Sequence, residues 1–189
     1  MGVIIVTSGI VAGKIMRRLV DGHPRLCERG IWIQADDSRG EASSTAANIL
    51  ARRRGPVAVV ADADSLSPHM IAEQRGWIEY LLGEAAPPSE WRILLIAPEV
   101  AVLLFRDEQL LRSLLPVSPS FEQLIRGRYE PNRVLAELFA QAGEQPFPES
   151  LVRRIEQAEL SSLWAAPELR PLEAFLLEKL AAQQPGTVP

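Results

Sequence analysis

The chain has 189 residues, of which 47% are hydrophobic and 23% are charged, and its formal net charge is −4. This is the composition of a globular protein with one substantial core, and the negative charge excludes a general electrostatic attraction to nucleic acid. The sequence contains no apolar run of about 18 residues and no leader segment, so we expect a cytoplasmic protein without a membrane segment.

The first half of the chain alternates between two hydrophobic patterns. Apolar, β-branched runs predict four short strands, and helical patterns lie between them. The strands are expected at residues 2–7, 31–33, 56–61 and 91–97, and the helices at 11–21, 43–54 and 68–83. Because alternating strands and helices form right-handed crossovers, the sequence predicts an α/β fold: a four-stranded parallel sheet with helices on both faces.

The second half lacks strand patterns and predicts an all-helical extension. Its apolar residues recur at helical spacing, and prolines separate the segments. We expect helices at residues 100–115, 121–128, 132–142, 149–164 and 168–182. The predicted organisation is an α/β domain over residues 1–98, a helical extension over 99–182 and a disordered tail over 183–189. The extension is a candidate docking surface for a protein partner.

Two aspartates follow the third predicted strand. The buried run Val57–Ala61 leads directly into Asp62, Ala63 and Asp64. The carboxyl ends of parallel strands are where α/β proteins bind ligands, and alternate residues of a strand project to the same side. Two carboxylates this close repel each other unless a cation neutralises them, and Mg²⁺ prefers oxygen ligands. The alternative is that these residues only shape the turn into the next helix.

Acidic residues also follow two of the other strands. Asp36 and Asp37 come after the second strand, and Glu99 comes after the fourth. Together with Asp62 and Asp64 they predict five carboxylates along one edge of the sheet, enough for one or two Mg²⁺ ions. Alternatively, Asp36 and Asp37 belong to a solvated loop and Glu99 is an acid at a helix N-terminus.

Four residues are candidates for binding phosphate. Ser8 and Gly9 precede a helix whose first N–H groups can bind an anion, and Lys14 lies about one turn further on. Arg39, near the end of the second strand, is the fourth. The segment is not a P-loop, because the two glycines are one residue too close and Ile15 stands where a Mg²⁺-binding Ser or Thr would follow the lysine.

Residues 2–105 resemble a Toprim domain, the metal-binding fold of topoisomerases, primases and nucleases of the overcoming-lysogenization-defect type. The resemblance lies in a first strand that ends near a glycine, the helix that follows it, the Asp62-Ala63-Asp64 motif after the third strand, and a strand that ends in Ile96-Ala97-Pro98-Glu99. It implies that Asp62 and Asp64 bind Mg²⁺ and that the partner is nucleic acid.

One position departs from the family pattern. Toprim domains carry a glutamate before the glycine at the end of the first strand, whereas this chain has Ser8-Gly9. A serine hydroxyl does not replace a carboxylate in charge or in proton transfer at neutral pH. The sequence thus favours a degenerate Toprim-like protein that acts as a binding or regulatory subunit of a nucleic-acid-processing or defence-type assembly. The alternative is a Mg²⁺-dependent nuclease or phosphodiesterase that uses Asp62 and Asp64.

Overall fold

The computed structural model describes residues 2–27, 30–144 and 146–182, and its centre is a four-stranded parallel sheet. The strands are β1 (Val3–Ser8), β2 (Ile31–Asp36), β3 (Val57–Asp62) and β4 (Trp91–Ile96), arranged in the order β2-β1-β3-β4. Strand β3 is almost completely buried, as expected for a central strand covered on both faces. The predicted α/β fold with a parallel sheet is confirmed.

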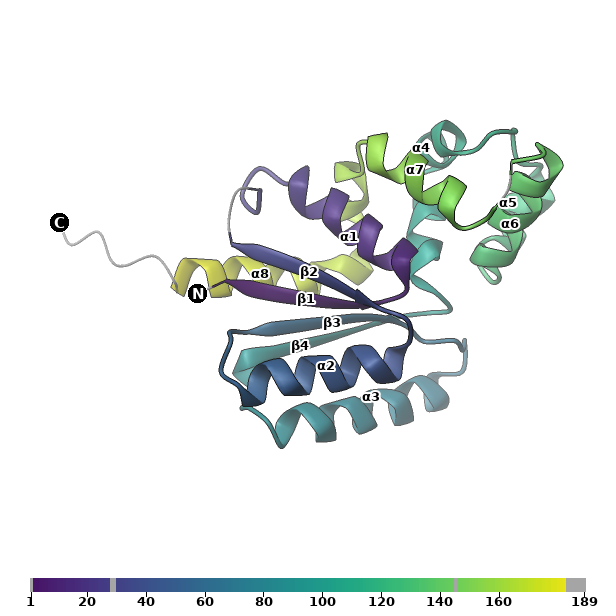
Figure 1. The fold of residues 1–189 in the computed structure, drawn as a ribbon. Helices are drawn as coiled ribbons and strands as arrows, with labels where there is room; N and C mark the ends of the chain where they lie inside the picture. Colours follow the sequence, from purple (N-terminus) through teal and green to yellow (C-terminus); the bar gives the residue numbers. More distant parts are fainter. Residues whose placement is uncertain (1, 28–29, 145, 183–189) are drawn as a thin grey trace.

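Helices cover both faces of the sheet (Figure 1). Helix α1 (Ile10–Asp21) lies on one face and packs the apolar side formed by Ile15, Met16 and Leu19 into the core. Helices α2 (Arg39–Ala51) and α3 (Pro68–Gly83) lie on the other face, where α2 covers β1 and β3 and α3 covers β4. The apolar faces of these helices determine the three layers.

The second half of the chain packs against the α1 face of the sheet. Helix α8 returns to β4 and β1 (Figure 1), and one hydrophobic core joins Val60 and Leu94 of the sheet to Leu138 and Phe175 of the extension. Its helical segments are η2 (Val100–Arg106), α4 (Glu108–Leu114), α5 (Phe121–Arg126), α6 (Pro131–Gln141), α7 (Glu149–Gln157), η3 (Ser161–Ala165), η4 (Pro167–Leu169) and α8 (Arg170–Ala182). The other short segment, η1 (Pro88–Glu90), precedes β4.

Two of the predicted helices are each divided in the structure. The predicted helix 100–115 is a 3₁₀ segment, η2, followed by α4, because the Asp107 side chain accepts a hydrogen bond from the Leu110 N–H at 3.0 Å and starts a new helix. The predicted helix 149–164 ends at Gln157, and η3 follows it. The predicted tail, 183–189, lies outside the described residues. Across the described residues, no helix is long and apolar enough to span a membrane.

Candidate functional site

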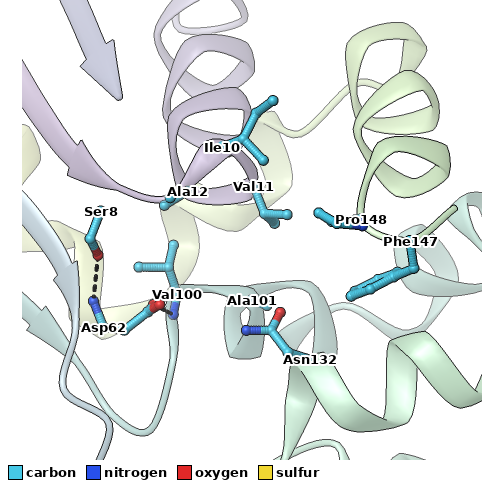
Figure 2. A pocket seen from close by; sticks show the side chains of 11 residues that line it. Ser8, Ile10, Val11, Ala12, Asp62, Val100, Ala101, Asn132, Phe147 and Pro148 are labelled. Atoms are coloured by element: carbon cyan, nitrogen blue, oxygen red, sulfur yellow. Dashed lines mark hydrogen bonds between the residues drawn. The ribbon is translucent and has the colours of Figure 1, made fainter. Parts of the chain in front are cut away.

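The reversal of strand order places a cavity at the centre of the sheet edge. From β1 the chain moves to β2 on one side and then crosses to β3 on the other side of β1, so the point of reversal lies between β1 and β3. Open α/β sheets bind their ligands outside the carboxyl ends of the strands at such a point. A cavity of about 290 Å³ lies there (Figure 2). Its position makes it the candidate functional site.

Both halves of the chain line this cavity. The start of α1 forms one wall, and residues of the extension, Phe147 and Pro148 among them, lie opposite (Figure 2). Gly9 has a φ of 82°, a left-handed conformation that favours glycine, and in the described structure no side chain caps the first turn of α1. The first N–H groups of a helix lack intrahelical acceptors and carry the positive end of its dipole. The full lining is Ser8, Gly9, Ile10, Val11, Ala12, Asp62, Val100, Ala101, Asn132, Phe147 and Pro148.

Asp62 is the acidic residue of the cavity. Its Oδ1 accepts a hydrogen bond from the Val100 N–H at 2.6 Å. Burial raises the pKa of the Asp62 carboxyl to about 6; the Val100 N–H and Arg39 oppose this shift, and the negative charges of Asp64 and Glu99 add to it. The structure therefore brings these three acids close enough to influence one another.

Asp64 and Arg39 form an ion pair at the end of β3. Asp64 has a φ of 51°, and its side chain, 62% exposed, pairs with Arg39 at 2.9 Å. The same Arg39 Nη1 donates to the backbone oxygen of Asp62 at 2.8 Å. Because Asp64 adopts a left-handed conformation, it no longer follows the alternation of the strand that the sequence analysis assumed. Arg39, the candidate phosphate ligand, fixes the turn after β3.

Ser8 and Lys14 also make contacts within the protein. The Ser8 Oγ accepts a hydrogen bond from the Asp62 N–H at 3.1 Å and so connects the ends of β1 and β3 (Figure 2). Lys14 forms an ion pair with Glu156 of α7. Of the four candidate phosphate ligands, Ser8 and Gly9 line the cavity, whereas Lys14 and Arg39 are absent from its lining.

The remaining three candidate carboxylates are spread along the sheet edge. The Asp36 Oδ1 accepts from the Gln34 side chain at 3.0 Å, while its Oδ2 is buried without a hydrogen-bond partner among the described atoms. Asp37 is exposed. Glu99 accepts a hydrogen bond from the Asn132 N–H at 3.0 Å and thereby caps α6, a different helix from the one predicted to follow Glu99.

These positions do not assemble a magnesium site. Over residues 2–27, 30–144 and 146–182, no group of three acidic, histidine or cysteine side chains lies close enough to hold a metal ion. Asp62, Asp64 and Glu99 each accept hydrogen bonds from protein donors. Each of these hydrogen bonds engages one oxygen of its carboxylate, and Mg²⁺ binding stays a prediction for titration to test.

The residues of the extension in the cavity were missed by the sequence analysis. Asn132 and Phe147 lie more than a hundred residues from Ser8 in the chain, and no local motif marks them. The prolines around Phe147 were interpreted only as helix boundaries. Contacts between distant segments depend on tertiary packing, which periodicity does not encode.

Comparisons with protein-family models, curated proteins and solved structures found no significant match. The Toprim resemblance therefore depends on the residues quoted from this sequence.

Proposed function

We propose that the protein is a degenerate Toprim-like module that acts as a binding or regulatory subunit of a nucleic-acid-processing or defence-type assembly. The observation that carries this proposal is that the acids at the strand ends accept hydrogen bonds from donors within the protein. Asp62, Asp64 and Glu99 accept hydrogen bonds from Val100, Arg39 and Asn132. Metal-dependent phosphoryl transfer needs carboxylates that are free to ligate the ion.

The environment of Ser8 supports a binding role. Its side chain occupies the position where the resemblance implies a catalytic glutamate, but its oxygen accepts the Asp62 N–H. Ser8 is only 6% exposed, although it lines the cavity. The end of β1 thus holds the strands together and has no group that transfers protons at neutral pH.

An exposed apolar surface supports docking of a protein partner through the extension. Phe121 and Ile125 of α5 and Tyr129 of the following turn recur every four residues, and all three are exposed. Apolar side chains gathered at the surface often mark a protein interface. We name these three residues the α5 stripe and infer that it contacts another subunit of the assembly.

One observation favours the alternative, a Mg²⁺-dependent nuclease or phosphodiesterase. The raised pKa of Asp62 reflects a buried carboxyl close to Asp64 and Glu99. A divalent cation would relieve the repulsion between these groups, provided that the Arg39 and Asn132 contacts opened to release their carboxylates.

Titration calorimetry with Mg²⁺ and Mn²⁺ separates the two functions. The samples are wild type, Asp62→Asn with Asp64→Asn, and Asp37→Asn as a matched control that removes an exposed carboxylate from the same sheet edge. The same samples are then incubated with single- and double-stranded nucleic acid and each metal. We expect no binding at millimolar metal and no cleavage by any sample. Metal binding and cleavage by wild type and by Asp37→Asn, both lost in the double variant, would establish the nuclease.

A further inference from the structure

A second hollow lies at the far end of α2 from Asp62. It has a volume of about 260 Å³ and lies between the edge strand β2 and the last turns of α2. Since α2 has 13 residues, about 20 Å separate its two ends. The hollow is lined by Gln34, Thr45, Asn48, Ile49, Arg52 and Arg54. Five of these six side chains carry hydrogen-bonding groups.

The arginines at this hollow lack acidic partners. Within the described ranges, Arg52, Arg53 and Arg54 form no ion pair and no side-chain hydrogen bond, although other surface arginines such as Arg126 and Arg154 pair with glutamates. The negative end of the α2 dipole attracts one nearby cation, so the dipole accounts for one of these arginines and not for the others. In a chain with a net charge of −4, the unpaired guanidinium groups of Arg52 and Arg54 place positive charge at this hollow, whereas Arg53 lines a different hollow.

An exposed tryptophan lies on the same face of the edge strand. Trp32 precedes Gln34 by two residues in β2, so both side chains project to the face that carries the hollow. Trp32 is 58% exposed. Its ring lies against Gly2, where an added Cβ would come within 1.8 Å of the ring. One part of the ring is thus packed on backbone, and the rest is open to a planar ligand.

We propose that this surface binds a nucleotide, with the phosphate held by Arg52 and Arg54 and the base stacked on Trp32. A guanidinium forks onto phosphate oxygens, and aromatic rings stack on unpaired bases without needing a particular sequence. The nucleotide belongs to single-stranded nucleic acid or is free, since both offer the same phosphate and base. This inference rests on the proposed function, because it names the ligand that the binding module recognises.

Fluorescence anisotropy tests the proposal with a labelled oligothymidylate of about 15 nucleotides, within the site sizes usual for such surfaces. The variants are Arg52→Gln with Arg54→Gln, Trp32→Ala and Trp32→Phe. Arg17→Gln with Arg25→Gln is the matched control, because it removes two exposed arginines without ion pairs in the described structure from the α1 side. Urea unfolding confirms that each variant is folded.

We expect the Arg52/Arg54 variant to bind about tenfold more weakly. The slope of the logarithm of its binding constant against the logarithm of the salt concentration should become less negative by about 1.4, the value for two phosphate contacts on a single strand. Trp32→Ala should also bind the oligonucleotide about tenfold more weakly. Trp32→Phe should keep most of the wild-type affinity, because phenylalanine still stacks on a base. The matched control should bind like wild type.

Competition with thymidine monophosphate and with a DNA duplex identifies the form of the ligand. If the monophosphate competes as well as the oligonucleotide, the ligand is a free nucleotide. If the monophosphate competes much more weakly, the ligand is single-stranded nucleic acid. Equal affinity in the Arg52/Arg54 variant and the matched control, or stronger binding of the duplex than of the single strand, would overturn the proposal. Cleavage of the bound strand with Mg²⁺ would overturn the proposed function but not this nucleotide site. Failure to bind the oligonucleotide would overturn this site but not the proposed function.

Discussion

Asp62 links the stability of the protein to the chemistry of its cavity. Its carboxyl has a pKa of about 6 in the folded chain, against 3.8 when unperturbed, chiefly because of burial. Between these two values the folded chain holds more protons than the unfolded chain. The contribution of Asp62 to the free energy of unfolding therefore falls as the pH rises from about 4 to about 6, and stays at its lower level above that range.

We predict that Asp62→Asn stabilises the protein above pH 6. Asparagine keeps an oxygen for the Val100 N–H but removes the buried charge. The gain in the free energy of unfolding should be on the order of 2 kcal/mol at pH 7.5, from a shift of about two pKa units reduced for partial solvation. Urea unfolding of both proteins from pH 4 to pH 8 measures it.

Asp64→Asn is the control for this prediction. Asp64 is exposed, so losing its pair with Arg39 should change stability by less than about 1 kcal/mol. If the difference in the free energy of unfolding between wild type and Asp62→Asn stays constant from pH 4 to pH 8, the Asp62 carboxyl does not titrate as we describe.

At the scale of elements, α5 combines a stable helix start with an exposed apolar surface. A reciprocal capping box between Ser120 and Gln123 fixes its first turn. Every residue of α5 remains at least partly exposed, and Phe121 reaches 79%. Local capping, the pairing of Arg126 with Glu137 of α6 and the partial burial of Leu124 together hold this helix, while its outer side chains stay exposed.

We predict that Phe121→Ser with Ile125→Ser leaves the fold intact and removes an apolar binding surface. Because both side chains are exposed, the free energy of unfolding should change by no more than about 0.5 kcal/mol. The fluorescence of a bound hydrophobic dye should fall. Leu138→Ala, in the core, should instead cost about 2–5 kcal/mol. A large loss of stability in the α5 variant would show that the stripe packs within the molecule.

The whole molecule depends on one core shared by the sheet and the extension. On the α1 face, Val60 and Leu94 of the sheet share a core with Leu138 and Phe175. Polar contacts add to this packing: Trp164 donates to the Leu19 oxygen at 2.9 Å, and Arg18 donates to the Ala158 oxygen. The extension therefore covers apolar surface that residues 1–98 alone would expose to water.

We predict that the fragment 1–98 does not fold to a stable monomer, although 1–182 does. Without the extension the β4 side of the sheet exposes a contiguous apolar face, which favours aggregation. Size-exclusion chromatography and circular dichroism of both fragments test this. A cooperatively unfolding, monomeric 1–98 fragment would show that the α/β part is an independent domain.

The sequence by itself determined the alternation of strands and helices and the parallel sheet, because periodicity and breaker residues are local signals. The third strand ends at Asp62, directly after the buried run that predicted it. The positive φ of Gly9, between β1 and α1, is known only from the structure. The break at Asp107 was missed because Val100–Leu115 is apolar at helical spacing, and a single capping residue divides it.

Only the tertiary structure decided what the strand-end residues do. Adjacency in sequence suggested that Asp62 and Asp64 share an ion, but the left-handed turn at Asp64 and the reach of Arg39 from α2 separate their roles. Glu99 caps a helix that begins more than thirty residues later. Such partners arise when segments distant in sequence pack together, and the free energy of that packing is a property of the whole core rather than of any motif.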